Sequence, residues 1–300
     1  AAPDQTSSTL ATNAARMALE RAHLNGEDID LVIAATTTPD GLFPSVASIV
    51  QDRIGAVHAG AFDVNAACVG FLSALAAGSQ FVATGAYRRV LVIGTEVLSR
   101  IVNWQDRGTC VLFGDGAGAV VLEAADFGGP LGFVLHSDGS KKEALFAEGV
   151  CGPRDSDGNG PPSHLCMINM DGPAIFKFAV QAMTKSTREA LAKSHLTIDD
   201  VDVLVPHQAN LRIIEGTAKH LGIPPEKALV TVDKYGNTSS ASIPVALSEA
   251  ARDGRIPEGA RLAICAFGGG LAWGSMIFEW STTGVAPARA ELAHATAGGG

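Results

Sequence analysis

Aromatic and charged residues are both scarce in this 300-residue chain, at 6% and 18% of the composition. The charge that is present is mainly negative, with a formal net charge of −9 at pH 7. A nucleic-acid-binding protein carries a basic surface, so we expect no nucleic-acid partner, although a local basic patch can still receive an acidic one. No run approaches the roughly 20 apolar residues that span a bilayer, so we expect no membrane partner.

Cysteine is also scarce, and its five residues form no CxxC pair. An odd count without such pairs favours neither a disulfide framework nor a zinc site, and no histidine spacing suggests a metal. The start of the chain lacks the charged and apolar regions of a signal peptide. We therefore expect a cytoplasmic protein without a metal, and most of its cysteines to be small buried hydrophobes.

An internal repeat organises the chain, because the segment 16–30 recurs at 188–202. The two segments are identical at seven of fifteen positions, which is well above chance for unrelated segments. Each copy has an amphipathic helix, a short polar link and an apolar strand, and a second helix and strand follow in both. Near-continuous apolar strands that alternate with helices predict sheets covered on both faces. The repeat therefore predicts a duplicated α/β unit.

The predicted elements divide the chain into two halves, residues 1–130 and 131–281, followed by a tail or linker at 282–300. The predicted helices cover about 10–23, 69–84, 176–194 and 239–252, and the predicted strands cover 31–35, 90–94, 131–135, 203–205 and 262–266. Strand 131–135 has no counterpart in the first half. We therefore expect the sheet of the first half to have an unpaired edge, which would reduce stability. Residues 150–165, with several Pro, Gly and Asp, predict a surface loop over the site.

Cys68 is the first candidate for chemistry because it follows an apolar strand and opens a predicted helix. A helix start offers unpaired N–H groups and the positive end of the helix dipole, which predict a lowered thiol pKa. Small neighbours leave room for a substrate to reach the sulfur. A buried structural cysteine is the alternative that this local pattern leaves open.

His207 and Asn237 are the next candidates. His207 follows strand 203–205, and ligands collect at the carboxyl ends of the strands in such sheets. Asn237 lies in the turn that the repeat aligns with the turn of Cys68, so the two turns are expected to face one another. An N-cap cluster of Asn, Thr and Ser explains that turn equally well.

Two glycine clusters complete the candidates. Residues 114–118 lack the spacing of a nucleotide-binding loop and predict a tight turn between strands. Residues 268–270 follow a predicted strand and could direct a backbone N–H at an oxyanion, an interaction that contributes about 3–4 kcal/mol in acyl transfer. His23 and His195 belong to the repeat and are interpreted as structural.

Taken together, these segments resemble the β-ketoacyl-acyl-carrier-protein synthase III family over about residues 1–281. The resemblance rests on six motifs in the family's order: Ala66-Ala67-Cys68, Asp106-Arg107-Gly108-Thr109, Phe113-Gly114-Asp115-Gly116-Ala117-Gly118, Val205-Pro206-His207-Gln208-Ala209-Asn210, Gly236-Asn237-Thr238-Ser239 and Ala266-Phe267-Gly268-Gly269-Gly270. The family's fold is the thiolase-like, duplicated α/β/α/β/α arrangement of five layers, which agrees with the repeat.

The resemblance implies a two-stage reaction. Cys68 takes the acyl group of an acyl-CoA, and malonyl-acyl-carrier-protein then loses CO₂ and attacks that thioester. His207 and Asn237 stabilise the enolate, and the N–H groups of Cys68 and Gly269 form the oxyanion hole. No cofactor is implied beyond these substrates.

The resemblance also implies binding roles for other residues. Arg107 stacks on the CoA adenine, and Phe43 enters the acyl pocket of a partner subunit, which implies a homodimer. Arg212 and Lys219 receive the acidic carrier protein, with His220 where a second lysine is frequent. The remaining substrate-binding positions line the channel, namely Gly172, Ala209, Asn210 and Phe267.

The chain departs from the family pattern at its start, where the first strand, a tryptophan opposite Arg107 and a channel arginine have no counterpart. A degradative thiolase needs a second cysteine two residues before the first glycine of 268–270, but Ala266 stands there and Cys265 is one residue earlier. That shift points a strand side chain to the opposite face, which argues against a thiolase. A pathway-specific relative with another starter or acceptor stays open, as does a non-catalytic heterodimer partner.

Overall fold

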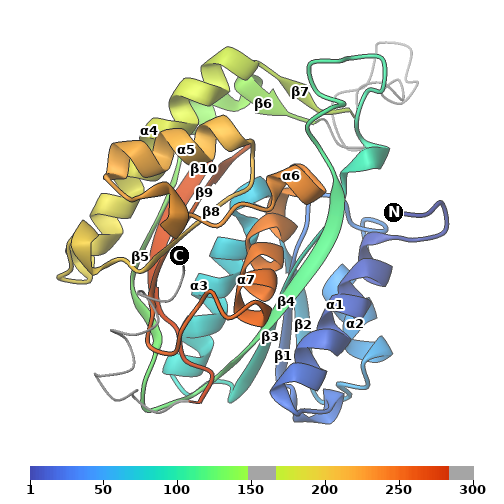
Figure 1. The fold of residues 1–300 in the computed structure, drawn as a ribbon. Coiled ribbons are helices and arrows are strands. Elements are labelled where there is room, and N and C mark those ends of the chain that lie inside the picture. The colour runs from blue at the N-terminus through green and yellow to red at the C-terminus, as the bar shows by residue number, and fades with distance from the viewer. Residues whose placement is uncertain (148–166, 284–300) are drawn as a thin grey trace.

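The computed structural model of this chain describes residues 1–147 and 167–283. Two four-stranded sheets form the frame of these residues (Figure 1). The first sheet has the order β2-β1-β3-β4, with bounds β1 Leu31–Ala35, β2 Gly60–Val64, β3 Arg89–Val97 and β4 Asp115–Glu123. The second has the order β5-β10-β9-β8, with bounds β5 Gly129–Ser137, β8 Val203–Pro206, β9 Arg261–Gly268 and β10 Ala272–Glu279. A small ribbon pairs β6 Leu145–Phe146 with β7 Asn169–Met170.

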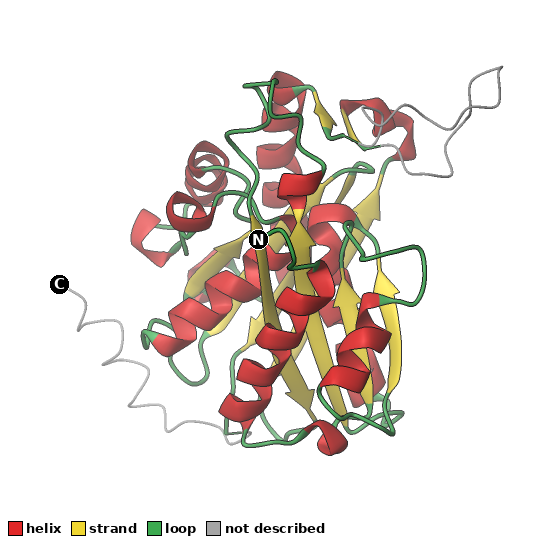
Figure 2. Ribbon diagram, turned by 90° about the vertical axis from the view of Figure 1, so that its right-hand side faces the viewer, coloured by secondary structure: helices red, strands yellow, loops and turns green. Residues whose placement is uncertain are grey.

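Helices cover both faces of each sheet and give five layers (Figures 1 and 2). The outer face of the first sheet carries α1 Ser7–Ala22 and α2 Val46–Arg53, and the outer face of the second carries α4 Gly172–Lys193 and α5 Leu211–Leu221. Between the sheets lie α3 Gly70–Ala83 and α7 Ser242–Arg252. Three apolar clusters fill the spaces between these layers. The predicted α/β/α/β/α fold is confirmed.

The first sheet shows why the sequence folds in this way. All five residues of β1 are buried, as expected for a parallel strand with helices on both faces. α1 begins after Thr6, whose side chain accepts a hydrogen bond from the Thr9 amide, and it ends at His23 with left-handed backbone. The predictions for residues 31–35 and 10–23 are therefore confirmed, the latter with a start three residues earlier.

The duplication is visible in backbone conformation as well as in sequence. His23 and His195, which the repeat aligns, both have φ of 55°, and the aligned pair Ala67 and Ser239 have φ of 46° and 47°. Positive φ is uncommon for residues other than glycine, so its recurrence at aligned positions shows that the halves share a fold. The domain boundaries at 130 and 281 stay predictions.

The two sheets differ at both edges, and the predicted asymmetry concerns the edge beyond β4 and β10. In the second sheet β10 pairs with β9 on one side and with β5 on the other. Its counterpart β4 pairs with β3, and no strand among residues 1–147 and 167–283 pairs with its other edge. The expected asymmetry is confirmed, and its cost in stability stays a prediction.

The prediction of a tight turn at the glycine cluster 114–118 is wrong. The cluster does not form such a turn, because β4 begins at Asp115 and contains most of the cluster. A Cβ on Gly118 would lie 2.8 Å from the Val245 nitrogen of α7, and one on Gly114 would lie 2.2 Å from the Tyr235 oxygen. These glycines therefore allow β4, and the residue just before it, to pack directly on the second half of the chain.

Two further predictions concern the remaining segments. The predicted loop at 150–165 and most of the predicted tail at 282–300 lie outside the described residues. No helix in the described ranges is both long and apolar enough to cross a membrane.

Candidate active site

The three predicted catalytic side chains are held by elements that meet between the sheets. Cys68 lies in a 3₁₀ turn, Ala67–Val69, that joins β2 to α3. His207 directly follows β8, and Asn237 precedes the 3₁₀ turn Ser239–Ala241 that leads into α7. The two 3₁₀ turns contact one another, so the prediction that the turns of the two halves face each other is confirmed. All three side chains are buried.

Gly268 at the end of β9 packs directly against Cys68. A Cβ at Gly268 would lie 2.8 Å from the Cys68 nitrogen and 2.9 Å from its Cβ, so only glycine allows the end of β9 to come this close to Cys68. Burial raises the pKa of the Cys68 thiol to about 12, while a hydrogen bond with the Ser239 hydroxyl lowers it. The prediction of a lowered thiol pKa is therefore wrong, because burial between two sheets outweighs the favourable helix start.

His207 is held by a serine. Its Nδ1 lies 2.7 Å from Ser242 Oγ, which also accepts a hydrogen bond of 3.3 Å from the Gln208 amide. The Ser242 proton is then free to point at Nδ1, and we infer that Nε2 carries the ring proton. Nε2 is buried and has no hydrogen-bond partner among the described residues. Burial also lowers the pKa of His207 to about 3, which keeps the ring neutral.

Asn237 is fixed through both its backbone and its side chain. Its amide donates to Leu112 O at 2.8 Å, and its carbonyl accepts from the Gly114 amide at 2.9 Å. Its Oδ1 accepts from the Ser239 amide at 2.9 Å. This bond fixes the orientation of the side-chain amide and leaves the Nδ2 group as the donor for a ligand.

The glycine run and its neighbour pack around these groups. A Cβ on Gly269 would lie 3.7 Å from the Ala67 Cβ, which places this residue beside the turn of Cys68. The Phe267 ring lies edge-on to the His207 ring, with centroids 5.7 Å apart. The oxyanion role of Gly269 stays a prediction.

The other predicted binding residues divide into two groups. Ala209 is buried two residues after His207, and Asn210 caps α5 by accepting from the Ile213 amide at 3.0 Å. Arg107 and Phe43 instead lie in exposed loops, with Phe43 86% exposed.

The remaining three predicted residues lie at helices of the second half. Gly172 is the first residue of α4, whereas Arg212 and Lys219 are exposed on α5. Ala209 and Asn210 are neighbours of His207 in the chain, whereas Gly172 is half-buried and the other four positions are exposed.

Cys265 lies on the far side of the second sheet. It packs in the apolar cluster of α4 and α5 and forms a hydrogen bond with Thr187 of α4, whereas its neighbour Ala266 belongs to the cluster between the sheets. Burial raises its pKa to about 12. The argument against a thiolase, which needs a cysteine on the inner face, is confirmed.

Sequence reasoning missed three polar residues that support the site: Ser239 beside Cys68, Ser242 on His207, and the buried Glu96 of β3. The serines follow Asn237 in a hydroxyl-rich run that also fits a helix cap, so composition alone gave no signal. The repeat does give a signal for Ser240, which lies between these two serines, because it aligns Ser240 with Cys68.

This five-layer fold, with a cysteine between its sheets and a neutral histidine and an asparagine nearby, defines the class of thiolase-like condensing enzymes. Two family models match the chain, the 3-oxoacyl-[acyl-carrier-protein] synthase III model at residues 62–139 and its C-terminal model at residues 191–280. The chain belongs to the β-ketoacyl-acyl-carrier-protein synthase III family and is a condensing acyltransferase of that type.

Individual relatives support this family assignment. The β-ketoacyl-acyl-carrier-protein synthase III of Xanthomonas campestris is 52% identical over 280 residues, and that of Clostridium acetobutylicum is 49% identical over 280; each match covers 93% of this chain and 85% of the relative. The crystal structure of the Aquifex aeolicus synthase III has a TM-score of 0.86 at 43% identity, covering 93% of this chain and 86% of that one. A priming β-ketosynthase of the R1128 polyketide pathway has a TM-score of 0.86 at 36% identity, covering 94% and 84%.

Proposed function

We propose that this chain joins an acyl-CoA starter to malonyl-acyl-carrier-protein through an acyl thioester on Cys68, as the first condensation of fatty acid biosynthesis. The observation that carries the proposal is a buried histidine nitrogen without a partner, between the same two sheets as the buried Cys68. His207 Nε2 has no hydrogen-bond partner among the described residues, and Gly268 lets the end of β9 pack directly on the Cys68 backbone.

In the first stage, the Cys68 sulfur attacks the thioester carbonyl of the acyl-CoA. A sulfur–carbon bond forms, the bond to the CoA sulfur breaks, and the thiol proton leaves with CoA. The N–H groups of Cys68 and Gly269 hold the oxyanion in between. Burial of the sulfur excludes water that would hydrolyse the acyl-enzyme.

In the second stage, the malonyl group loses CO₂ and the bonding electrons move into an enolate. His207 Nε2 and Asn237 Nδ2 donate hydrogen bonds to the enolate oxygen, and a neutral imidazole with its proton on Nε2 is suited to that task. The enolate carbon then attacks the acyl thioester, the bond to the Cys68 sulfur breaks, and the sulfur leaves as a thiolate that takes a proton from the solvent to restore the thiol. Phe267 supports the His207 ring from the side.

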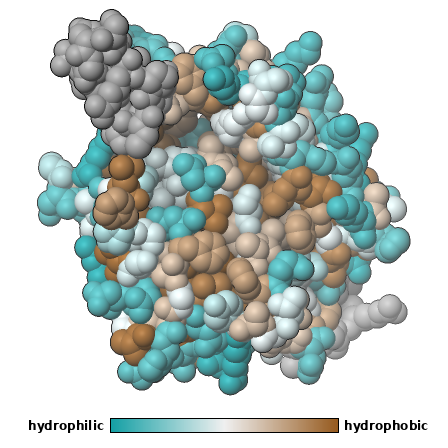
Figure 3. Space-filling model, turned by 180° about the vertical axis from the view of Figure 1, so that it is seen from behind, coloured by the Kyte–Doolittle hydropathy of each residue, from teal (hydrophilic) through white to brown (hydrophobic). Residues whose placement is uncertain are grey.

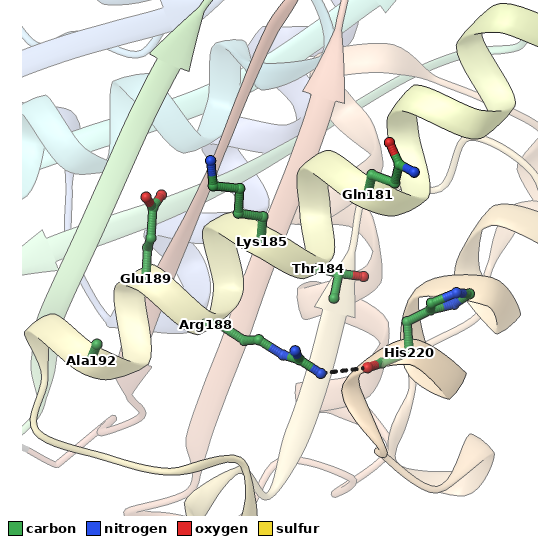
Figure 4. Close-up of a pocket in the computed structure, with 7 residues that line it drawn as sticks. All are labelled: Gln181, Thr184, Lys185, Arg188, Glu189, Ala192 and His220. Carbon is green, nitrogen blue, oxygen red and sulfur yellow. Dashed lines mark hydrogen bonds between the residues drawn. The ribbon is translucent and has the colours of Figure 1, made fainter.

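We further propose that α5 and the adjacent groove receive the acidic carrier protein. Arg212 and Lys219 are exposed seven residues apart on α5, two turns along one face. A groove of about 630 Å³ between α4 and α5 is lined by two cations, Lys185 and Arg188, and one anion, Glu189, and so adds one net positive charge. Figure 4 shows Arg188 reaching across to α5, where it donates to the His220 carbonyl at 2.9 Å. Opposite charges on the two proteins would steer their encounter.

The substrate channel is proposed to run from this surface to Cys68 past Gly172, Ala209 and Asn210, with Arg107 on the CoA adenine. These assignments extend the family pattern to matching positions of this chain. Their support is the chain path from exposed α5 through Asn210 to the buried His207.

A homodimer is proposed on the basis of exposed apolar surface. Leu42 and Phe43 are 72% and 86% exposed in one loop, and Phe62 is exposed on the edge strand β2. Figure 3, which views the molecule from behind, shows a broad apolar area in the middle of that face. Large exposed apolar areas mark interaction sites, and Phe43 would enter the acyl pocket of the partner subunit.

A pathway-specific role is the second candidate, because a polyketide priming β-ketosynthase is also a close structural relative. The same three side chains would serve a different starter or acceptor. A cytoplasmic location is proposed for either role and is supported by the free thiols of Cys68, Cys110 and Cys265.

Intact-protein mass spectrometry with a panel of acyl-CoAs tests the proposal. We expect one acyl group per chain, mapped to Cys68 and absent from Cys68→Ala. His207→Ala should still acylate while its decarboxylation of malonyl-carrier-protein stops. An adduct that persists in Cys68→Ala would show another nucleophile, and no adduct with any acyl-CoA would favour a carrier-loaded relative or a non-catalytic partner.

A further inference from the structure

Glu96, near the end of β3, is a buried carboxylate that the reaction above does not use. Its side chain is 0% exposed, and no ion pair involves it among residues 1–147 and 167–283. Oε2 accepts hydrogen bonds from Thr38 Oγ1 at 2.8 Å, Thr37 Oγ1 at 2.9 Å and the Thr37 amide at 3.1 Å. A buried carboxylate is costly, so this set of donors indicates a specific role.

The other carboxylate oxygen reaches toward the catalytic groups. The Ser240 hydroxyl lies 3.0 Å from Glu96 Oε1 and 2.8 Å from the Ala35 carbonyl at the end of β1. Ser240 is therefore anchored to the ends of two strands of the first sheet. Burial raises the pKa of Glu96, and its charge lies near enough to Cys68 to raise the pKa of that thiol as well.

Ser240 lies in the middle of the segment that holds the site, residues 237–242. Asn237 is at its start, and Ser239 contacts Cys68. Ser242 at its end holds His207. An anchor at Ser240 therefore acts on the supports of all three catalytic side chains.

The duplication gives an independent reason to assign a role to Glu96. The offset that aligns the two halves makes Ser240 the counterpart of Cys68 and Gly268 the counterpart of Glu96. In the half that carries Gly268, this strand position has no side chain, because a Cβ there would collide with Cys68. In the other half, a carboxylate fills the equivalent position and is bonded to Ser240.

We propose that Glu96 is a positioning residue, which acts through Ser240 to hold segment 237–242 so that its side chains and His207 face Cys68. This inference rests on the proposed condensation. Misplacing catalytic groups by about 1 Å can cost about 100-fold in rate. Glu96→Ala should therefore lower kcat per acylatable Cys68 by about 100-fold and change the KM for malonyl-carrier-protein by less than about threefold.

The variants separate positioning from general stability. In Glu96→Gln the remaining oxygen still accepts from the Thr37 amide, and the new NH₂ group can donate to Ser240 Oγ while the Ser240 proton goes to the Ala35 carbonyl, so we expect this variant to restore kcat to within about tenfold of wild type. Ser240→Ala should resemble Glu96→Ala, and the double variant should be no slower than either one. Asp30→Asn is the matched control, because Asp30 accepts from the Arg88 and Arg89 amides at the opposite end of β3. It should lower Tm without changing kcat per acylatable Cys68.

Each outcome decides the inference. Wild-type kcat per acylatable Cys68 in Glu96→Ala would overturn it, as would additive losses in the double variant. If Glu96→Ala does not fold, wild-type kcat in Ser240→Ala overturns it instead. A wild-type enzyme that neither acylates nor condenses would refute the proposed function, whereas an active wild type with an unaffected Glu96→Ala refutes only the positioning role.

Discussion

Replacing Ser242 by alanine tests how the histidine is prepared for decarboxylation. The change removes one hydroxyl from a residue that is 1% exposed and leaves the Nδ1 of His207 without its partner at 2.7 Å. The proton is then no longer directed to Nε2, the nitrogen that we assign to the enolate oxygen.

The expected magnitude follows from the lost hydrogen bond. A buried polar group left without its partner costs about 1–3 kcal/mol. If this loss falls on the decarboxylation transition state, it corresponds to a decrease of about 5-fold to 150-fold in rate, because each 1.36 kcal/mol is about tenfold. Acylation of Cys68 should change by less than about threefold, since His207 is not its base in the proposed mechanism.

The assay measures CO₂ release from malonyl-carrier-protein and acylation from acyl-CoA in separate experiments. Ser275→Ala is the matched control, because Ser275 is a fully buried serine that bonds Ser186 and Thr187 near α4 rather than the site. It should lose comparable stability and keep both rates. Equal losses in both half-reactions of Ser242→Ala, or none in decarboxylation, would refute the assigned role of Ser242.

Three further predictions address the thiol, the acyl pocket and the docking surface. Burial raises the pKa of Cys68 to about 12, so its alkylation by iodoacetamide, mapped by peptide, should rise about tenfold per pH unit from pH 7 to 10; a plateau below pH 9 would contradict this. Phe43→Ala should broaden the accepted acyl length in the mass assay, and an unchanged starter profile would place the pocket elsewhere. Arg212→Glu with Lys219→Glu should raise the KM for malonyl-carrier-protein at least tenfold and leave acylation by acyl-CoA unchanged. Equal effects on both substrates would argue against docking on α5.

The strands and the duplication were predictable because they depend on local sequence. Residues 31–35 are five consecutive apolar residues between polar links, and β1 has those bounds. The repeat recurs in strands, in 3₁₀ turns and in the left-handed residues His23 and His195. Cys68 and His207 were predictable because each follows a strand, where such folds place their ligands.

The support for these side chains was not predictable, because it depends on contacts between residues that are distant in the chain. Ser242 is 35 residues from His207 in the chain, and Ser240 bonds Glu96 from 144 residues away. The prediction of a lowered pKa for Cys68 is wrong for the same reason. The favourable helix start is local and visible in the sequence, whereas burial beneath β9 comes from a strand of the other half.

The protonation states of His207 and Cys68 indicate which residues act in each of the two stages. Burial keeps His207 neutral, with its pKa at about 3, and keeps Cys68 protonated, with its pKa at about 12, so no thiolate–imidazolium pair forms in the site without substrate. If Ser242 directs the ring proton to Nε2, His207 can donate to an oxyanion but has no free nitrogen with which to take the Cys68 proton. His207 is then suited to the enolate stage, and the transfer of the acyl group to Cys68 must depend on the arriving thioester and the backbone N–H groups around the sulfur. A pH profile of acylation that follows the thiol in both wild type and His207→Ala is the expected consequence, and a limb that is present in the wild type and lost in His207→Ala would show that the imidazole acts as the base.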